Sequence, residues 1–377
     1  AVMALVGSFV HFAFADAHWF LEKLDAAYDS SYLDRPDANF DYADVVGVGT
    51  EYFGYDGFTN IPLWVSEAAD RREYYENLGV EFVPGDLTDP DTLGPVLDGV
   101  NYVMHVASLF DYSAPLALNR KINVEGMRNL CEAGKEAGIE KMVLWGTIGV
   151  YGVQGNPIVT EEATPNPGNA YEISKMEQEK LGLEYSERGD FAVTVIRPAP
   201  VYGPGNRYGF VNMMKMACMF PHVPVPVKMK TRLPSVNVRD VAAAGLFLLE
   251  APNEKTDGEV FNLIDDSNIP LPDFLFFIAG LLGRETIKIN FPMYMPVILN
   301  IGHTAATLSG IVSKRILRQA RPLLEDATVY YIQFDYQYSN QKLKDIGFKF
   351  LYPDCRMGLI EMVDWIKKEN YEPLKIF

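Results

Sequence analysis

The sequence predicts an α/β fold, in which a doubly wound parallel sheet is followed by a smaller, partly helical C-terminal lobe. Short apolar runs alternate with stretches of helical length up to residue 204, a pattern typical of a parallel sheet. The first of these runs are apolar throughout, as expected for strands covered on both faces. Beyond residue 204 the alternation becomes irregular. We therefore expect residues 1–204 to form the sheet domain, with 238–264 returning to it, and residues 205–377 to form the lobe.

The strands of the sheet domain are expected at the apolar runs. They fall at residues 2–10, 44–50, 80–83, 100–108, 140–147 and 191–197. Helices are expected between them at residues 17–28, 67–78, 90–98, 116–137 and 170–187. The helix at 116–137 is long and amphipathic, so it should pack one face against the sheet.

The C-terminal lobe is expected to mix short strands with helices. Strands near 223–229 and 259–264 are separated by a helix at 238–251. Further helices are expected at 271–283, 293–318 and 355–369. This part of the chain should fold over the sheet.

The charge distribution restricts the class of partner. The formal net charge is −17, and residues 1–100 contain 19 Asp and Glu against 4 Lys and Arg. Such an acidic segment repels phosphate backbones, so we expect no nucleic-acid partner. No apolar run reaches the ~20 residues of a membrane-spanning helix, so no span is expected.

The cysteines and histidines show no spacing typical of a metal or redox site. Cys131, Cys218 and Cys355 are far apart, and the five histidines are scattered. We therefore expect no metal ion. Cysteines without a disulfide framework are typical of a reducing compartment, and we expect a cytoplasmic location.

The chemistry is expected at Tyr171 and Lys175, which lie one helical turn apart on the same face of the helix at 170–187. A phenol normally loses its proton near pH 10, and a neighbouring ammonium lowers that pKa. The pair therefore predicts a general base that works near neutral pH. Thr147 ends the preceding strand, and carboxyl ends of parallel strands are where such sheets build their sites.

Thr147, Tyr171 and Lys175 resemble the catalytic triad of the extended short-chain dehydrogenase/reductase family. This family includes NAD-dependent epimerases and dehydratases and 3β-hydroxysteroid dehydrogenase-like enzymes. The resemblance is clear over roughly residues 78 to 270. It implies a Rossmann-type sheet domain that binds NAD, a C-terminal lobe that binds the substrate, and a homodimer formed through the helices at 116–137 and 170–187.

The resemblance also implies a role for each residue of the triad. Tyr171 exchanges the proton of a substrate hydroxyl or carbonyl while hydride moves. Lys175 lowers the pKa of Tyr171 and bonds the nicotinamide ribose. Thr147 donates a hydrogen bond to the reacting oxygen. The general acid–base step accounts for ~10²–10⁴-fold of rate.

Further residues match positions where the family binds its cofactor. They are Gly7, Asp86, Leu87, Val106, Ala107, Ser108, Asn123, Tyr171, Lys175, Pro198 and Val201. The first loop departs from the family, because a single glycine, Gly7, replaces the Gly-x-x-Gly-x-x-Gly pattern that lets backbone amides approach the pyrophosphate. Whether this loop binds pyrophosphate stays open. Gly49, Glu51 and Asp56 follow the second strand where NADP would need a basic residue, which favours NAD over NADP.

The substrate is less clearly indicated. Ser108, Thr147 and Arg232 are expected to contact it, and Arg232 lies near the place of a diphosphate-binding arginine in nucleotide-sugar enzymes of the family. The apolar segment from Phe291 onwards resembles the part of sterol dehydrogenases that handles apolar substrates, and we expect peripheral contact with a membrane through 291–312.

Three functions therefore stay open. The first is an NAD(P)-dependent oxidoreductase that interconverts a secondary alcohol and a ketone of a steroid-like or other apolar molecule. The second is a nucleotide-sugar epimerase or dehydratase. The third is a non-catalytic family member that serves as a structural subunit, which the glycine-poor first loop favours and the intact triad opposes.

Overall fold

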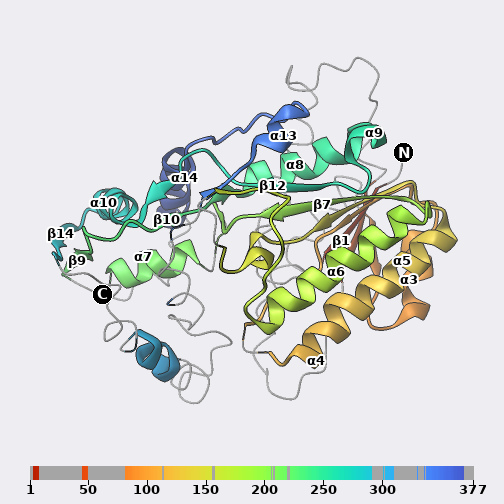
Figure 1. Cartoon of the computed structure of the whole chain (residues 1–377), viewed down its shortest axis with the longest axis horizontal. Coiled ribbons are helices and arrows are strands. Elements are labelled where there is room, and N and C mark those ends of the chain that lie inside the picture. Colours follow the sequence, from red (N-terminus) through yellow and green to blue (C-terminus); the bar gives the residue numbers. More distant parts are fainter. Residues whose placement is uncertain are drawn as a thin grey trace.

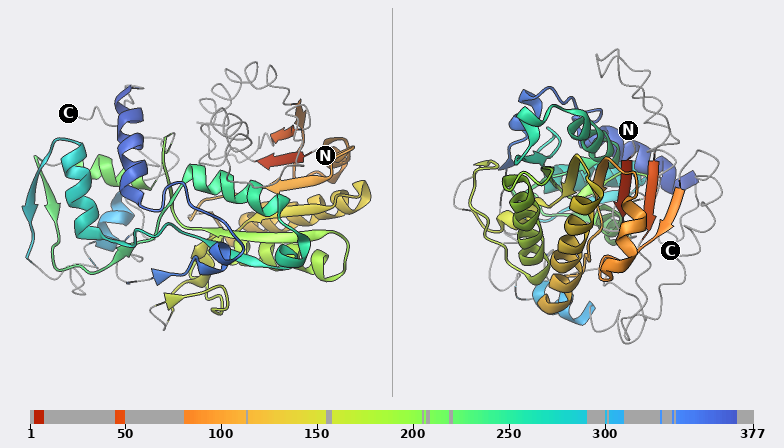
Figure 2. Two further views of the ribbon diagram at one scale, coloured as in Figure 1. Left: turned by 90° about the horizontal axis from the view of Figure 1, so that it is seen from above. Right: turned by 90° about the vertical axis from the view of Figure 1, so that its right-hand side faces the viewer.

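The structure is a computed structural model of the 377-residue chain. It describes residues 3–7, 45–49, 81–112, 114–154, 158–204, 206, 209–218, 221–290, 300, 302–309, 329, 335 and 337–368. The expected helices at 17–28 and 67–78 lie outside the described residues, as does the loop that follows Gly7. The described parts form two lobes that lie side by side along the long axis of the molecule (Figures 1 and 2).

A seven-stranded sheet forms the larger lobe, and all its neighbouring strands are parallel. The spatial order is β12-β7-β5-β4-β1-β2-β3. The prediction of a doubly wound parallel sheet is confirmed. Its strands are β1 (Met3–Gly7), β2 (Val45–Gly49), β3 (Glu81–Pro84), β4 (Tyr102–His105), β5 (Lys141–Trp145), β7 (Ala192–Pro198) and β12 (Val260–Leu263).

Helices cover both faces of this sheet because successive strand residues point to opposite sides. In β5, Met142 and Leu144 pack in one apolar cluster with α5 and α6, whereas Val143 and Trp145 pack in another with α8. The helices of this lobe are η2 (Pro90–Thr92), α3 (Leu93–Leu97), α4 (Leu116–Asn119), η3 (Arg120–Glu125), α5 (Gly126–Ala137), α6 (Ala170–Glu187), α8 (Val238–Glu250) and α9 (Asn253–Thr256).

The expected helix at 116–137 is helical along its whole length but is not a regular α-helix. Its middle turn, η3, is a π-helix of six residues that holds Asn123 on a buried side. A π-turn widens the helix locally and is frequent at functional sites. The expected helix at 170–187 matches α6, with the same first and last residue.

The smaller lobe packs helices α7 (Phe210–Cys218), α10 (Leu271–Leu281) and α14 (Cys355–Lys368) around one apolar cluster that includes Phe210, Phe274 and Leu359. Helix α7 was not predicted from the sequence. Outside the large sheet, the described residues form four two-stranded sheets. They pair β8 (Val201–Tyr202) with β11 (Val236–Asn237), β9 (His222–Val225) with β14 (Glu285–Lys288), β10 (Arg232–Leu233) with β13 (Ile269–Pro270), and β6 (Ile158–Val159) with β15 (Gln337–Tyr338).

Part of the expected helix at 293–318 is seen, since residues 302–309 are helical, while most of 291–312 lies outside the described residues. The pairing of β12 with β7 places residues 260–263 in the sheet. The domain boundary at residue 204 stays a prediction. None of the described helices is long and apolar enough to cross a membrane.

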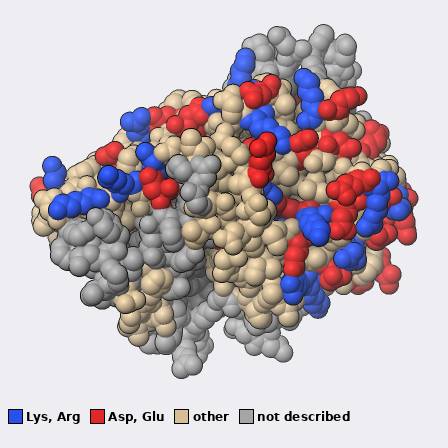
Figure 3. Space-filling view, in the orientation of Figure 1, with Lys and Arg blue, Asp and Glu red and all other residues tan. Residues whose placement is uncertain are grey.

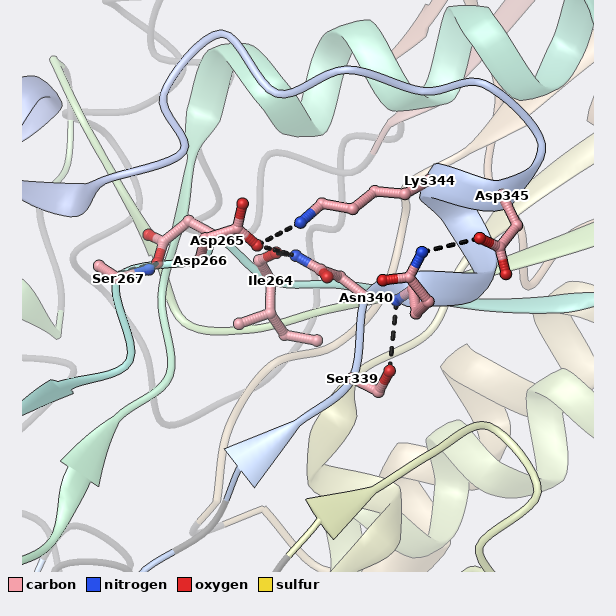
Figure 4. Close-up of polar contacts among 9 residues, drawn as sticks. Ile264, Asp265, Asp266, Ser267, Ser339, Asn340, Lys344 and Asp345 are labelled. Atoms are coloured by element: carbon pink, nitrogen blue, oxygen red, sulfur yellow. Dashed lines mark hydrogen bonds and ion pairs between the residues drawn. The ribbon is translucent and has the colours of Figure 1, made fainter.

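The segment around Asn340 is hydrogen-bonded to the loop after β12 (Figure 4). Asn340, the residue before α13 (Gln341–Asp345), donates from Nδ2 to the Ile264 carbonyl at 2.7 Å and to Asp266 Oδ1 at 2.8 Å. Lys344 forms an ion pair with the same carboxylate. These bonds connect the C-terminal segment to the strand that completes the sheet.

Candidate active site

The strand order reverses between β1 and β4, which lie next to each other although they are the first and fourth strands of the sheet in the chain. In open parallel sheets the crevice outside the carboxyl ends at such a point binds the ligand. Gly7 is the last residue of β1, and Val106, Ala107 and Ser108 leave β4 at the same edge. The structure therefore brings these four predicted residues together.

Thr147 follows β5 in extended conformation and caps the short helix η4 (Ile148–Tyr151). Its Oγ1 accepts a hydrogen bond of 3.1 Å from the Gly149 amide. Since the hydroxyl is the acceptor in that bond, it keeps its own proton for donation. The side chain is half-buried, so an oxygen of a bound molecule can reach it.

The first turn of α6 is fixed by its cap. Asn169 accepts from the Glu172 amide at 3.0 Å, and the Glu172 carboxylate accepts from the Gly168 amide at 2.8 Å. The first bond satisfies an amide that the helix leaves unpaired, and the second fixes the residue before the cap. Tyr171 therefore sits in the first turn, where the positive end of the helix dipole favours an anion such as a phenolate.

Aromatic side chains surround the ring of Tyr171, which is 6% exposed. Phe110 contacts it edge to face, with 4.8 Å between ring centroids, and Tyr112 does so at 5.7 Å. Both come from the segment after β4. The ring of Tyr171 is therefore set among aromatic rings that the segment after β4 supplies.

Lys175 is buried one turn further along α6 and is 2% exposed. Its Nζ donates to the Trp145 carbonyl at 2.6 Å and to Gln178 Oε1. Burial lowers the pKa of Lys175 to about 8, against the opposing effect of the Glu179 carboxylate. The ammonium is thus held at the end of β5, next to the turn that carries Thr147.

Asn123 joins the loop after β4 to α6. Its Oδ1 accepts from the Leu109 amide at 2.6 Å, and its Nδ2 donates to the Leu109 carbonyl at 3.2 Å and to Ser174 Oγ at 2.9 Å. Ser174 in turn donates to the Tyr171 carbonyl at 2.7 Å. The asparagine therefore positions the segment that contacts the Tyr171 ring, and it is fully buried.

Residues 59–263 match the family model of the NAD-dependent epimerase/dehydratase family, which is more than half of the chain. The chain belongs to this family. The resemblance to extended short-chain dehydrogenases/reductases is thereby confirmed, and with it the prediction of an enzyme of this type.

Relatives of more than one activity are similar to this family member. It is 24% identical over 239 residues to UDP-glucose 4-epimerase of Vibrio cholerae, covering 61% of this chain and 72% of the epimerase. It is 27% identical over 286 residues to the decarboxylating sterol-4-alpha-carboxylate 3-dehydrogenase of Mus musculus, covering 74% and 77%. The dTDP-glucose 4,6-dehydratase DesIV of Streptomyces venezuelae, solved with NAD and TYD, shares the fold, with a TM-score of 0.69 at 18% identity over 99% of this chain and 100% of DesIV.

The described residues fit a dinucleotide in this family. The buried ammonium of Lys175 lies at the end of β5, and two of its three N–H groups donate hydrogen bonds within the protein, to the Trp145 carbonyl and to Gln178 Oε1. Gly126, at the start of α5, would place a Cβ 3.0 Å from that of Leu87, so the helix packs closely on the loop after β3. Within the described residues, no group of three or more His, Cys, Asp or Glu side chains could hold a metal ion.

Other predicted residues are occupied by contacts within the protein. Asp86 Oδ1 accepts from the amide and hydroxyl of Thr88 at 2.8 and 2.9 Å. The Leu87 carbonyl accepts from Asn129 at 2.8 Å. Pro198 ends β7, and Val201 lies in β8. Arg232, in the smaller lobe, forms a 2.8 Å ion pair with Asp335. The cofactor or substrate contacts of these residues stay predictions.

Three features of the site were not predicted from the sequence. These are His105 at the end of β4, Gln178 on α6, and the buried ion pair of Glu179 with Arg197. Gln178 follows Lys175 by three residues, so helical spacing could have found it. The other two depend on contacts between separate strands and helices, which no local pattern reveals.

Proposed function

We propose that this family member is an NAD(P)-dependent oxidoreductase that interconverts a secondary alcohol and a ketone of a steroid-like or other apolar substrate. The observation that supports it is the geometry around Tyr171. The phenol lies one helical turn before a buried ammonium, and two aromatic rings border it. Such a site suits proton exchange with an apolar alcohol.

The residues divide the work as follows. Tyr171 takes the proton from the substrate hydroxyl during oxidation and returns one during reduction. Lys175 favours the phenolate by its charge and keeps one proton for a ribose hydroxyl. Thr147 donates to the reacting oxygen. NAD, when bound, accepts the hydride or supplies it.

The cofactor would be held by the residues at the crevice. Val106, Ala107 and Ser108 would line it after β4, and Asn123 fixes the segment that follows them. Asp86 and Leu87, then Pro198 and Val201, border it on either side by family resemblance. NAD is preferred to NADP because Gly49 ends β2 without a basic residue beside it; Glu51 and Asp56, on which the preference also rests, lie outside the described residues.

The choice of an apolar substrate is supported by the sterol dehydrogenase relative and by Phe110 and Tyr112 beside the phenol. Contact with a membrane surface through 291–312 belongs to the same proposal. We also expect a homodimer that forms through α4, η3, α5 and α6, and a cytoplasmic location.

A second function, nucleotide-sugar epimerisation or dehydration, is favoured by the UDP-glucose 4-epimerase relative. It would use Arg232 for the diphosphate. Asp335 pairs with Arg232 through Nη1, so a diphosphate would bind the other guanidinium N–H groups or compete with Asp335.

A substrate panel tests both functions. NADH formation is followed with sterols and other apolar secondary alcohols, and product formation is followed with UDP- and dTDP-sugars. Turnover of an apolar alcohol supports the first function, whereas turnover of nucleotide sugars alone contradicts it.

Cofactor binding is tested separately by thermal unfolding with NAD(H) or NADP(H). A ligand at ~100 times its dissociation constant adds about 2.7 kcal/mol to the free energy of unfolding. A rise in the melting temperature with NAD(H) larger than with NADP(H) supports the NAD preference. No shift with either would favour the non-catalytic alternative.

In the view of Figure 3, lysine and arginine side chains are interspersed with aspartate and glutamate over the half of the molecule that holds α5 and α6. A continuous basic patch is not seen on this face among the described residues. This distribution agrees with a small-molecule substrate rather than a nucleic acid.

A further inference from the structure

A chain of three buried polar side chains links the end of β4 to Lys175. Gln178 is 0% exposed, His105 1% and Lys175 2%. Lys175 Nζ donates to Gln178 Oε1, and Gln178 Nε2 lies 3.0 Å from His105 Nε2. Burying polar groups is unfavourable unless they are paired, so these contacts restrict each other's geometry.

The hydrogen bonds from Lys175 through Gln178 to His105 allow only one assignment of donors and acceptors. An ammonium has donors and no acceptor, so Gln178 must present its oxygen to Lys175 and its amide nitrogen to His105. His105 Nε2 must then accept, which requires a neutral imidazole with its proton on Nδ1, a buried atom for which the described residues supply no acceptor. Burial, followed by the charge of Lys175, lowers the pKa of His105 to about 3, so the neutral form prevails near pH 7.

Lys175 is consequently held by neutral acceptors, the Trp145 carbonyl and the Gln178 amide oxygen. The titratable groups around it are His105 from β4, and Tyr171 and Glu179 from its own helix. Glu179 is bound by Arg197 of β7 at 2.7 Å. The positive charge of Lys175 is therefore available to the phenol one turn away.

We propose that His105 and Gln178 are positioning residues for Lys175: the imidazole fixes the orientation of the Gln178 amide, and the amide oxygen holds the ammonium without neutralising it. This inference rests on the proposed function, because it assigns to the ammonium the task of acidifying Tyr171. A carboxylate in place of the amide would hold Lys175 equally well but would cancel its effect on the phenol.

The first experiment needs neither substrate nor cofactor. The protein is labelled with ¹³C at the lysine Cε, and Lys175 is titrated by NMR, its resonance being assigned with Lys175→Arg. In Gln178→Glu the pKa of Lys175 should rise by at least ~1 unit, because an opposite charge replaces a neutral acceptor. Tyr185→Phe is the matched control, since Tyr185 lies on the same helix as Lys175, the substitution removes its partly buried hydrogen bond to Glu132 of α5, and the pKa of Lys175 should stay unchanged.

The second experiment uses whichever alcohol turns over in the substrate panel. In the pH profile of kcat/KM for oxidation, the apparent pKa of the low-pH limb should rise by about one unit in Gln178→Glu and in His105→Leu. His105→Gln, whose amide oxygen can replace Nε2 as acceptor, should stay close to the parent. A fall in kcat on the order of tenfold should accompany the shifted limb, with the KM for NAD nearly unchanged.

Two results would overturn the inference. One is a Lys175 pKa in Gln178→Glu equal to that of the parent. The other is an equal loss in His105→Gln and His105→Leu with the acid limb unmoved, which would mean that the imidazole only packs. If no alcohol turns over, the proposed function fails but the NMR titration still decides the inference. If His105→Leu does not fold, Gln178→Glu decides it.

Discussion

Arg197 and Glu179 form an ion pair inside the protein, with 2.7 Å between the guanidinium Nη2 and the carboxylate Oε2. Both side chains are less than one-tenth exposed. Arg197 comes from β7, and Glu179 lies one turn after Lys175 on α6. The guanidinium also lies 4.8 Å from the centre of the Tyr151 ring. The pair therefore attaches the helix of Tyr171 and Lys175 to the sheet.

Removing one partner of this pair should be strongly destabilising. Glu179→Leu leaves the Arg197 charge buried without a counterion, and we expect a loss of about 3–5 kcal/mol in the free energy of unfolding, measured with urea. The double variant Glu179→Leu with Arg197→Met should recover much of that loss. A double variant no more stable than the single one would contradict this account.

Gly146 has no room for a side chain because Glu179 passes close to it. A Cβ there would lie 2.0 Å from Glu179 Oε1, which cannot move freely while Arg197 holds the carboxylate. We expect Gly146→Ala to lower the free energy of unfolding by about 1–3 kcal/mol. Gly94→Ala is the matched control, since nothing lies within 4 Å of its Cβ. Equal stability of the two variants would show that the site can relax.

Tyr171→Phe should remove turnover while keeping the fold and the cofactor site. The ring contacts with Phe110 and Tyr112 persist, but the proton donor and acceptor is lost. We expect kcat to fall by ~10²–10⁴-fold, with NADH affinity, measured by fluorescence, close to the parent. Tyr185→Phe should retain activity. Parent-like turnover in Tyr171→Phe would exclude the phenol as the acid–base group.

Asn123→Ala should affect both stability and activity. It removes three hydrogen bonds that connect the Leu109 backbone with Ser174, which we expect to lower the free energy of unfolding by about 1–3 kcal/mol. Asn119→Ala is a matched control, because among the described residues this buried asparagine bonds carbonyls of its own segment, Ala114 and Pro115. A kcat that falls equally in both variants would argue against a specific role for Asn123.

Asp265 should make stability depend on pH. Burial raises its pKa to about 7, although Ser267 and Ser235 donate to it. The native state therefore keeps a proton that the unfolded chain loses near pH 4, so this contribution to stability falls as pH rises from about 4 to 7.

Asp265→Asn should flatten that fall, by about 1.4 kcal/mol for each unit of pKa shift that is removed. The free energy of unfolding of parent and variant is compared at pH 4.5 and pH 7. Asp240, whose pKa is raised to about 7 by burial and, to a smaller extent, by the Asp265 carboxylate, remains in both proteins, so part of the fall should persist in the variant. Identical pH dependence in parent and variant would mean that Asp265 is ionised throughout.

The sequence by itself determined where the strands of the parallel sheet lie along the chain, the bounds of α6, and the placing of Tyr171 one helical turn before Lys175. These follow from local patterns: apolar runs mark buried strands, and a separation of four residues puts two side chains on one helical face. The same locality explains why α6 was predicted with its observed ends, since its cap residues lie beside it in the chain.

Only the tertiary structure decided what holds Lys175. His105 meets Gln178 across 73 residues, and Arg197 meets Glu179 across 18, because β4, β5 and β7 lie side by side and α6 packs on them. The sequence also did not predict the π-turn that carries Asn123, because the amphipathic pattern of residues 116–137 continues through it. A contact within one helix is set by its pitch, whereas a contact between elements depends on strand order and on which face each element buries.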